Sequence, residues 1–446
     1  MQITLFSSDS YICSKLYIFK NTELGRIHDC IDWENLVQLL PYKKTLRGAP
    51  SWLPSKGLFG MMFLKHYTGL SDQKLLDRFN TDWAMQLFCG VLLADNEAIK
   101  DNSFISKVRS YLGNHVDMQA VQKVLISAWK KEIPDKNVLL MDATCYEVHM
   151  RYPTDTKILW ESCEWIWGKQ IPALCELHGI RQPRSKYKEQ KKKTNVYNKQ
   201  RKKSYRKTRT RRSALLKLLL KGIDAYQQLL NRFKASGLTD KDAATFKTIK
   251  MVYQQQHHHF RYPKVKIRER IVSIYKPYIR PIVRGKENKP VEFGLKVHKI
   301  QVGGISILEH VSYKAFNECK RLKISTLKHK NLFGACSHVA GDAIYATNEN
   351  RKFTTKEKIT TNFVRKGRGK DDKSTKQIKA LLNKERSTRL EGSFGNEKEQ
   401  YLLRKIKARN PETELVWLFF GVFTANCVLI AKRRRRKQQQ ELKRAA

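Results

Sequence analysis

Residues 137–155 read NVLLMDATCYEVHMRYPTD, and this stretch decides the fold that the chain is expected to adopt. A short apolar run leads up to Asp142, and a rough alternation of apolar and polar residues follows it, which is a pattern typical of strands. Pro153 then supplies a turn. The stretch therefore predicts a buried strand that places the carboxylate of Asp142 where a strand leaves its sheet.

Two further acidic residues, far along the chain, stand in settings that suit the same chemistry. Asp342 follows the small and apolar stretch LFGACSHVAG, which predicts another buried strand. Glu391 lies in a long basic stretch, residues 373–409, with helical spacing and an expected break at residues 392–395. Two aspartates and a glutamate that converge can hold two divalent metal ions, and Mg²⁺ prefers such carboxylate oxygens. Two ions can activate the attacking water or hydroxyl and stabilise the leaving oxygen of a phosphodiester.

The composition indicates a polyanionic partner. Lys and Arg total 88 against 41 Asp and Glu, so the formal net charge is +47. Such a charge attracts nucleic acid through phosphate contacts and counterion release. None of the nine cysteines forms a C-x-x-C pair or a zinc-finger spacing with histidines, which argues against structural zinc and favours reduced thiols in a cytosolic protein.

The segment 181–212 is the most basic part of the chain, with 16 Lys or Arg residues against one acid, Glu189. Its self-repulsion predicts a flexible arm, or one that is helical only when bound. Such an arm can follow phosphates while Tyr187, Tyr197 and Tyr205 stack on unpaired bases, and a solvated linker is the alternative. The next stretch, residues 213–233, predicts an amphipathic helix that is broken or kinked at Gly222.

The order of elements predicts an α/β fold with a ribonuclease-H-like core, a mixed sheet flanked by helices. Strands on either side of Gly303–Gly304 predict a hairpin over 291–311. The apolar run 416–431 is shorter than the roughly 20 residues of a bilayer span and predicts a buried helix rather than a membrane segment. The expected parts are a helical N-terminal domain that binds DNA ends, dimerises or only packs (1–130), a split catalytic core (131–175 and 286–431), a basic helical insertion (176–285) and a basic tail (432–446).

These stretches resemble the DDE transposases of bacterial insertion sequences, in the superfamily marked by Y-x2-R-x3-E-x6-K around the third acid. The resemblance covers most of the chain and rests on MDATCYEVHMRYPTD, KPVEFGLKVHKIQVGGI, VAGDAIYATNEN and RLEGSFGNEKEQYLLRKIKAR, with GLSDQKLLDRFNTD and LFFGVFTANCVLIAKR further out. It implies that Asp142, Asp342 and Glu391 are catalytic ligands of two Mg²⁺ ions, for which Mn²⁺ can substitute.

The resemblance also suggests which basic residues contact DNA near the cut phosphate. Glu391 and Lys398 fit the E-x6-K spacing, so Lys398 is expected to contact DNA. The signature's tyrosine and arginine positions hold Lys384 and Ser387 instead, so that part is not carried over. Arg386 and Arg389 lie nearby and are the expected substitutes.

The implied protein is a transposase that binds terminal inverted repeats, cleaves at each transposon end and joins the freed 3′ hydroxyl to target DNA. It is expected to act on double-stranded DNA as a homodimer, without a membrane, in the bacterial cytoplasm at the nucleoid. A ribonuclease-H-like nuclease without strand transfer, a catalytically inactive DNA-binding derivative and a basic RNA-binding protein remain as alternatives.

Overall fold

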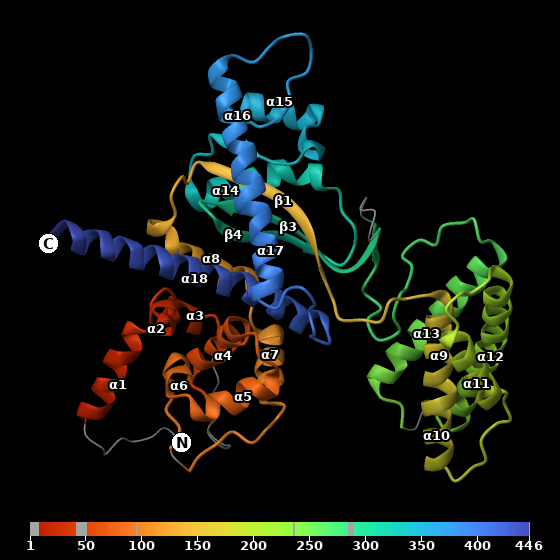
Figure 1. Cartoon of the computed structure of the whole chain (residues 1–446). Coiled ribbons are helices and arrows are strands. Elements are labelled where there is room, and N and C mark those ends of the chain that lie inside the picture. The colour runs from red at the N-terminus through yellow and green to blue at the C-terminus, as the bar shows by residue number, and fades with distance from the viewer. Residues whose placement is uncertain (1–8, 42–50, 95, 235–236, 284–289, 446) are drawn as a thin grey trace. The chain divides into compact units, whose positions relative to one another are not determined.

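The computed structural model describes residues 9–41, 51–94, 96–234, 237–283 and 290–445 (Figure 1). The chain divides into two compact units. The first comprises Met1–His149, Leu295–Ser312 and Phe316–Ala446, and the second comprises Met150–Gly294 and Tyr313–Ala315. The second unit therefore interrupts the first in sequence. The predicted boundary between residues 285 and 286 lies outside the described residues.

A mixed sheet lies at the centre of the first unit. Its strands follow the order β3-β1-β5-β6, with β4 paired to β3. The strands β1, β5 and β6 are parallel neighbours, and β3 and β4 form an antiparallel hairpin. The strands are β1 (Val138–Glu147), β3 (Val291–Val302), β4 (Ile305–Ser312), β5 (His338–Ala340) and β6 (Thr360–Thr361), and β2 (Pro281–Val283) pairs with the first residues of β3 in the second unit.

These strands confirm the predicted hairpin and the predicted strand before Asp342. The strand predicted before Asp142 is present, but it continues through Asp142 to Glu147, so this aspartate lies inside β1 and not where the strand leaves the sheet. The hairpin turns at Gly303 and Gly304, which both have positive φ, at 50° and 84°. Glycine suits this turn because a side chain is strained in that region. The strand before Asp342 is shorter than the apolar stretch predicts, because Leu332 and Phe333 end a helix instead.

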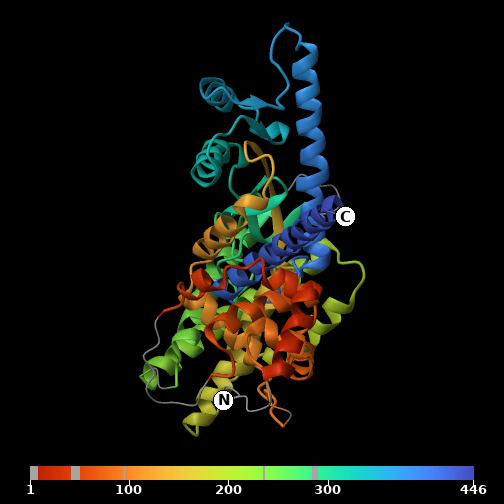
Figure 2. The same cartoon turned by 90° about the vertical axis from the view of Figure 1, so that its left-hand side faces the viewer.

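Helices cover both faces of the sheet. Neighbouring side chains of a strand point to opposite faces. Lys299 of β3 accordingly reaches Ser393 in α17 (Glu391–Gln400), whereas His298 lies 3.4 Å from the hydroxyl of Ser325 in α14 (Leu322–Phe333). Figures 1 and 2 show α17 and α14 on opposite sides of the sheet.

The helix that carries Glu391 continues through the predicted break. It consists of α16 (Lys373–Glu385), a π-helical turn (Arg386–Leu390) and α17. Gly392 and Gly395 lie inside α17, so the break expected at residues 392–395 is absent. The irregularity lies one turn earlier, in the π turn directly before Glu391.

The predicted buried helix near the end of the chain is confirmed. It forms part of α18 (Pro411–Ala445), which packs against α4 (Ser55–Thr68), α7 (Phe104–His115), α8 (Met118–Trp129) and β4. Asn426 exchanges two hydrogen bonds with the backbone of Ser306 in β4. Among the described residues, α18 alone is long and apolar enough to cross a membrane, and 83% of its apolar window is buried inside the protein. The N-terminal helices thus share a core with the sheet.

The second unit is helical. Its helices are α9 (Asp155–Trp165), α10 (Ile171–Leu177), α11 (Tyr187–Lys199), α12 (Tyr205–Arg232) and α13 (Asp240–Arg261), and a π-helical turn (Ile166–Gln170) joins the first two. The predicted break at Gly222 is absent, because α12 runs through it. A Cβ atom at Gly222 would lie 2.6 Å from Nε1 of Trp167, so glycine is required there by close packing between helices.

The prediction of a flexible arm over residues 181–212 is wrong for most of that segment. The helix α11 and the start of α12 occupy this segment. Gln190, Thr194 and Tyr197 of α11 are buried. The hydroxyl of Tyr197 lies 2.9 Å from the hydroxyl of Thr208, so the two helices are tied together. Packing of this one polar face therefore offsets the repulsion among the exposed lysines and arginines.

Candidate active site

Asp142 lies within β1, and Asp342 lies at the same level just beyond the end of β5, the parallel neighbour of β1. The last pair of the β1–β5 register joins Leu140 to Ala340, and each aspartate lies two residues further along. Adjacent strands are about 4.8 Å apart, so the backbones of the two aspartates lie close together, and the charge of Asp342 acts on Asp142. Each carboxylate accepts a 2.7 Å hydrogen bond from the next backbone N–H.

The surroundings of Asp142 favour a cation. Burial raises the pKa of Asp142, and the charges of Glu318 and Asp342 raise it further. The N–H of Ala143 and the guanidinium of Arg386 oppose this effect but do not cancel it. Asp142, which is partly buried, and Asp342, which is exposed, thus repel each other, and a positive ion between them would stabilise their charged forms.

Glu391 joins this group through Arg386. The Nη1 atom of Arg386 lies 2.8 Å from Oε1 of Glu391 and 3.6 Å from Oδ2 of Asp142. Because the intervening turn is π-helical, the N–H of Glu391 donates to the carbonyl of Arg386, five residues earlier. This extra residue per turn brings Arg386 onto the face of Glu391. The arginine expected at position 387 thus has a spatial counterpart one residue upstream.

The two other predicted DNA contacts differ in their surroundings. Strand alternation places Thr144 on the same face of β1 as Asp142, and Nζ of Lys398 lies 3.2 Å from the hydroxyl of Thr144. Lys398 is therefore on the active-site side of β1. Arg389 is half exposed and pairs at 2.8 Å with Glu385, one turn earlier in the helix. The contacts of Arg389 within the described residues do not place it beside Asp142.

A buried ion pair supports the helix of Glu391. Nζ of Lys299 lies 2.7 Å from Oε1 of Glu397, and both side chains are almost fully buried. Tyr146 donates its hydroxyl hydrogen bond to the same carboxylate, and Lys299 also donates to Ser393. Burial lowers the pKa of Lys299. Sequence reasoning missed this cluster, although Lys299 and Glu397 are charges within otherwise apolar or helical patterns.

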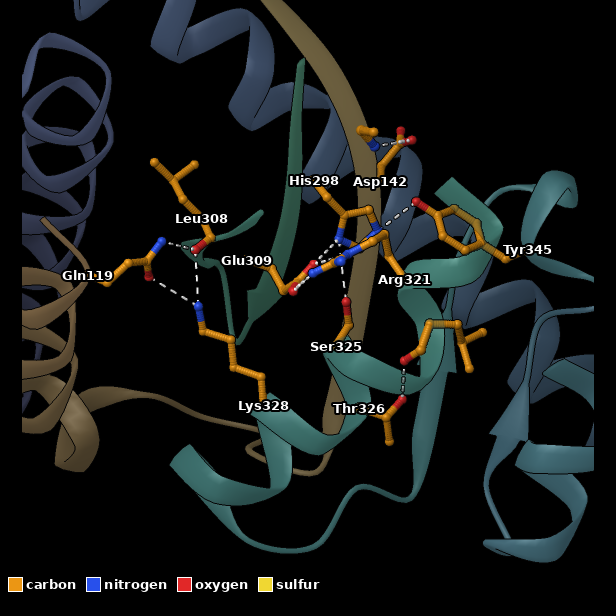
Figure 3. Close-up of polar contacts among 12 residues, drawn as sticks. Gln119, Asp142, His298, Leu308, Glu309, Arg321, Ser325, Thr326, Lys328 and Tyr345 are labelled. Carbon is orange, nitrogen blue, oxygen red and sulfur yellow. Dashed lines mark hydrogen bonds and ion pairs between the residues drawn. The ribbon is translucent and has the colours of Figure 1, made fainter. Parts of the chain in front are cut away.

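A second polar network, also missed, joins His298 to Glu309, Arg321 and Tyr345 (Figure 3). Asp342 caps a short 3₁₀ turn (Ala343–Tyr345), and the hydroxyl of Tyr345 lies 2.8 Å from Nε2 of His298. On its other side, Nδ1 of His298 lies 3.1 Å from Glu309, which also accepts two hydrogen bonds from Arg321.

The surroundings of Glu309 and Tyr345 shift the pKa of both groups. Burial raises the pKa of Glu309, but hydrogen bonds from His298 and Arg321 outweigh burial and lower it to about 2. Burial raises the pKa of Tyr345 well above its usual value, so its hydroxyl stays protonated. The network therefore fixes the turn that carries Asp342 to the centre of the sheet.

The donor chemistry fits a hard cation in part. The carboxylates of Asp142 and Asp342 are the ligand type that Mg²⁺ prefers. Within the described part of the chain, however, no three His, Cys, Asp or Glu side chains are grouped closely enough to hold a metal ion. Glu391 is directed to Arg386 rather than to the two aspartates. The roles of Asp142, Asp342 and Glu391 as metal ligands stay predictions.

Comparison with known proteins points to a transposase. Residues 13–111 match the family described as Transposase domain (DUF772). The matched part spans most of α1 (Asp9–Asn21) through most of α7, which precede the sheet. No curated protein and no solved structure matches the chain. The match indicates a DNA-processing enzyme and lies outside the segments that carry the three acids.

Proposed function

We propose that this chain is the DNA transposase of a bacterial insertion sequence, with a ribonuclease-H-like catalytic core. The observation that carries the proposal is the alignment of Asp142, within β1, with Asp342, just beyond the end of β5, together with the link from Glu391 to Asp142 through Arg386. The match of residues 13–111 to a transposase domain supports it. The sheet order also fits, with the β3–β4 hairpin on one side of β1 and the parallel strands β5 and β6 on the other.

In this proposal Asp142, Asp342 and Glu391 hold two Mg²⁺ ions, with Mn²⁺ as a substitute. When bound, such ions supply Lewis-acid stabilisation of the charge that develops on the phosphodiester oxygens. Arg386 contributes a guanidinium that can bind a phosphate in two-point fashion. Lys398, held beside Thr144, and Arg389 contribute further charge for the DNA backbone.

The proposed substrate is double-stranded DNA that carries the element's terminal inverted repeats. A net charge of +47 supports binding to such a polyanion. We propose a homodimer in the DNA complex, since two ends must be joined, and a location in the cytoplasm at the nucleoid.

Cleavage of a labelled transposon end by the purified full-length protein tests the proposal. We expect nicking at the end only with Mg²⁺ or Mn²⁺, and a loss of at least about 10³-fold in D142N and D342N, because each removes a charged ligand. The control variant D224N changes an exposed aspartate of α12 in the same way and should keep the full rate. Joining of the cleaved end to a second DNA separates a transposase from a nuclease. Metal-independent binding with a preference for RNA contradicts the proposal.

A further inference from the structure

A basic groove lies between α11 and α12 in the second unit. Its volume is about 750 Å³. It is lined by Lys192 and Lys193 from α11, and by Arg206, Lys207 and Arg211 from α12. Among the residues that the structure describes, no acidic side chain lines the groove, although Glu189 pairs with Lys193 at 2.5 Å. The groove thus concentrates positive charge from two rigid helices.

The floor of this groove is built around a buried guanidinium. Arg211 is only 7% exposed, and its Nη2 atom donates to Oε1 of Gln190. Its Nε atom is buried and has no hydrogen-bond partner among the described residues. Because Gln190 holds the guanidinium and Arg211 lines the groove, its positive charge is fixed beside the space that an anion would occupy.

We propose that this groove binds the phosphate backbone of duplex DNA without regard to base sequence. The inference rests on the proposed function for the identity of the polymer. Several cations along two helices suit consecutive phosphates of a chain better than a single small anion.

The tyrosines of this segment favour backbone contacts over base stacking. Tyr197 is 8% exposed and bonded to Thr208, and Tyr187 stacks on Trp160 with ring centres 5.5 Å apart. Tyr205 is 73% exposed, so of the three it alone is free to reach a base. A single-strand site usually presents several stacking aromatics, which this groove lacks within the described residues.

Salt-dependent binding of a labelled duplex of arbitrary sequence tests the groove in the full-length protein. The double variant K192A/K207A removes one exposed cation from each helix. Each lost phosphate contact reduces the slope of log affinity against log salt by about 0.9. We therefore expect a slope smaller by about 2 and an affinity at least about 10-fold lower at low salt.

The matched control is K217A/K221A, which removes two exposed lysines from α12 outside the groove. It has the same net charge and should keep the wild-type slope. Equal losses in both double variants would show a diffuse charge effect and overturn the proposal. So would competition by inorganic phosphate at millimolar concentration, which would indicate an isolated anion site, or tighter binding of single-stranded nucleic acid.

A catalytic variant separates this inference from the proposed function. D142N should lose cleavage by at least about 10³-fold, whereas adding K192A/K207A to D142N should still reduce its salt slope by about 2. If the wild-type protein binds through the groove and cleaves no DNA, the proposed function fails and the groove stands. If the wild-type protein cleaves and K192A/K207A keeps its slope, the groove alone is refuted.

Discussion

Among the described residues, the guanidinium of Arg386 is the only cationic group that contacts two of the three predicted catalytic acids. Its Nη1 atom lies within 4 Å of both Asp142 and Glu391. The three acids were predicted from the apolar runs before Asp142 and Asp342 and from the family resemblance, and Lys398 was predicted from the E-x6-K spacing of that resemblance. Sequence reasoning named Arg386 and Arg389 together as substitutes for the missing arginine, but it could not choose between them, because the spacing of the signature fits an α-helical turn and this turn is π-helical.

Replacing Arg386 should slow cleavage more than it affects folding. We expect R386A to lower the cleavage rate by about 10²-fold, because a positioned charge near the phosphate is lost. The Mg²⁺ concentration for half-maximal rate should fall, since a competing cation is gone. A magnesium titration of the cleavage rate measures both effects. R404A, which removes an exposed arginine paired with Glu399, serves as control. An R386A enzyme with an unchanged rate would remove this residue from the site.

Removing one partner of the Lys299–Glu397 pair should strongly destabilise the fold, whereas replacing both partners by apolar residues should not. E397A leaves a buried ammonium without its counter-charge, so the free energy of unfolding should fall by about 3–5 kcal/mol. The double variant K299M/E397L restores an apolar pair and should recover most of that loss. Urea unfolding followed by circular dichroism gives both values. A loss below about 1 kcal/mol in E397A would mean that water reaches the pair.

At the level of elements, the strands were predictable and the helix details were not. Apolar alternation marks β1, β3 and β4, and Gly303–Gly304 marks the hairpin. The glycine at position 222 misled the prediction, since its role is close packing against Trp167 rather than a break. The prediction for the basic segment 181–212 was also wrong. It considered only the repulsion among the charged residues and not the few buried side chains that hold α11 in place.

Two glycine variants separate packing from helix propensity. G222A should lower the free energy of unfolding by about 1–3 kcal/mol, because the new methyl group collides with Trp167. G395A in α17 meets no atom within 4 Å and should instead raise stability by about 0.5–1 kcal/mol. Thermal or urea unfolding measures both. Stabilisation by G222A would contradict the close approach seen between α12 and Trp167.

At the scale of the whole molecule, the N-terminal helices and the sheet share one core through α18. His66 of α4 illustrates the connection, because it is buried against Trp417 and its Nδ1 atom lies 3.0 Å from the carbonyl of Tyr401. No pattern before β1 could predict this contact, since its partners lie more than 300 residues away in sequence. Burial lowers the pKa of His66 to about 3.

This histidine should make the first unit sensitive to mild acid. The unfolded chain binds a proton at His66 near pH 6.5, whereas the folded chain does so only near pH 3. Its stabilising contribution is therefore complete above pH 6.5 and lost as the pH falls towards 3. One such group costs about 1.4 kcal/mol between pH 7.5 and pH 5.5. Urea unfolding gives the free energy of unfolding at both pH values, and the difference between them should be smaller in H66N by that amount. An unchanged difference would mean that water reaches His66 in the folded protein.

The identity of Asp142 as a metal ligand is the central claim, and a change of ligand tests it most directly. A thiolate is a softer ligand that accepts Mn²⁺ more readily than Mg²⁺. The cleavage rate of D142C on a labelled transposon end should therefore be lost with Mg²⁺ and restored in part with Mn²⁺, while D142A stays inactive with both ions. Equal activity of D142A and the wild-type protein with Mg²⁺ would contradict the account.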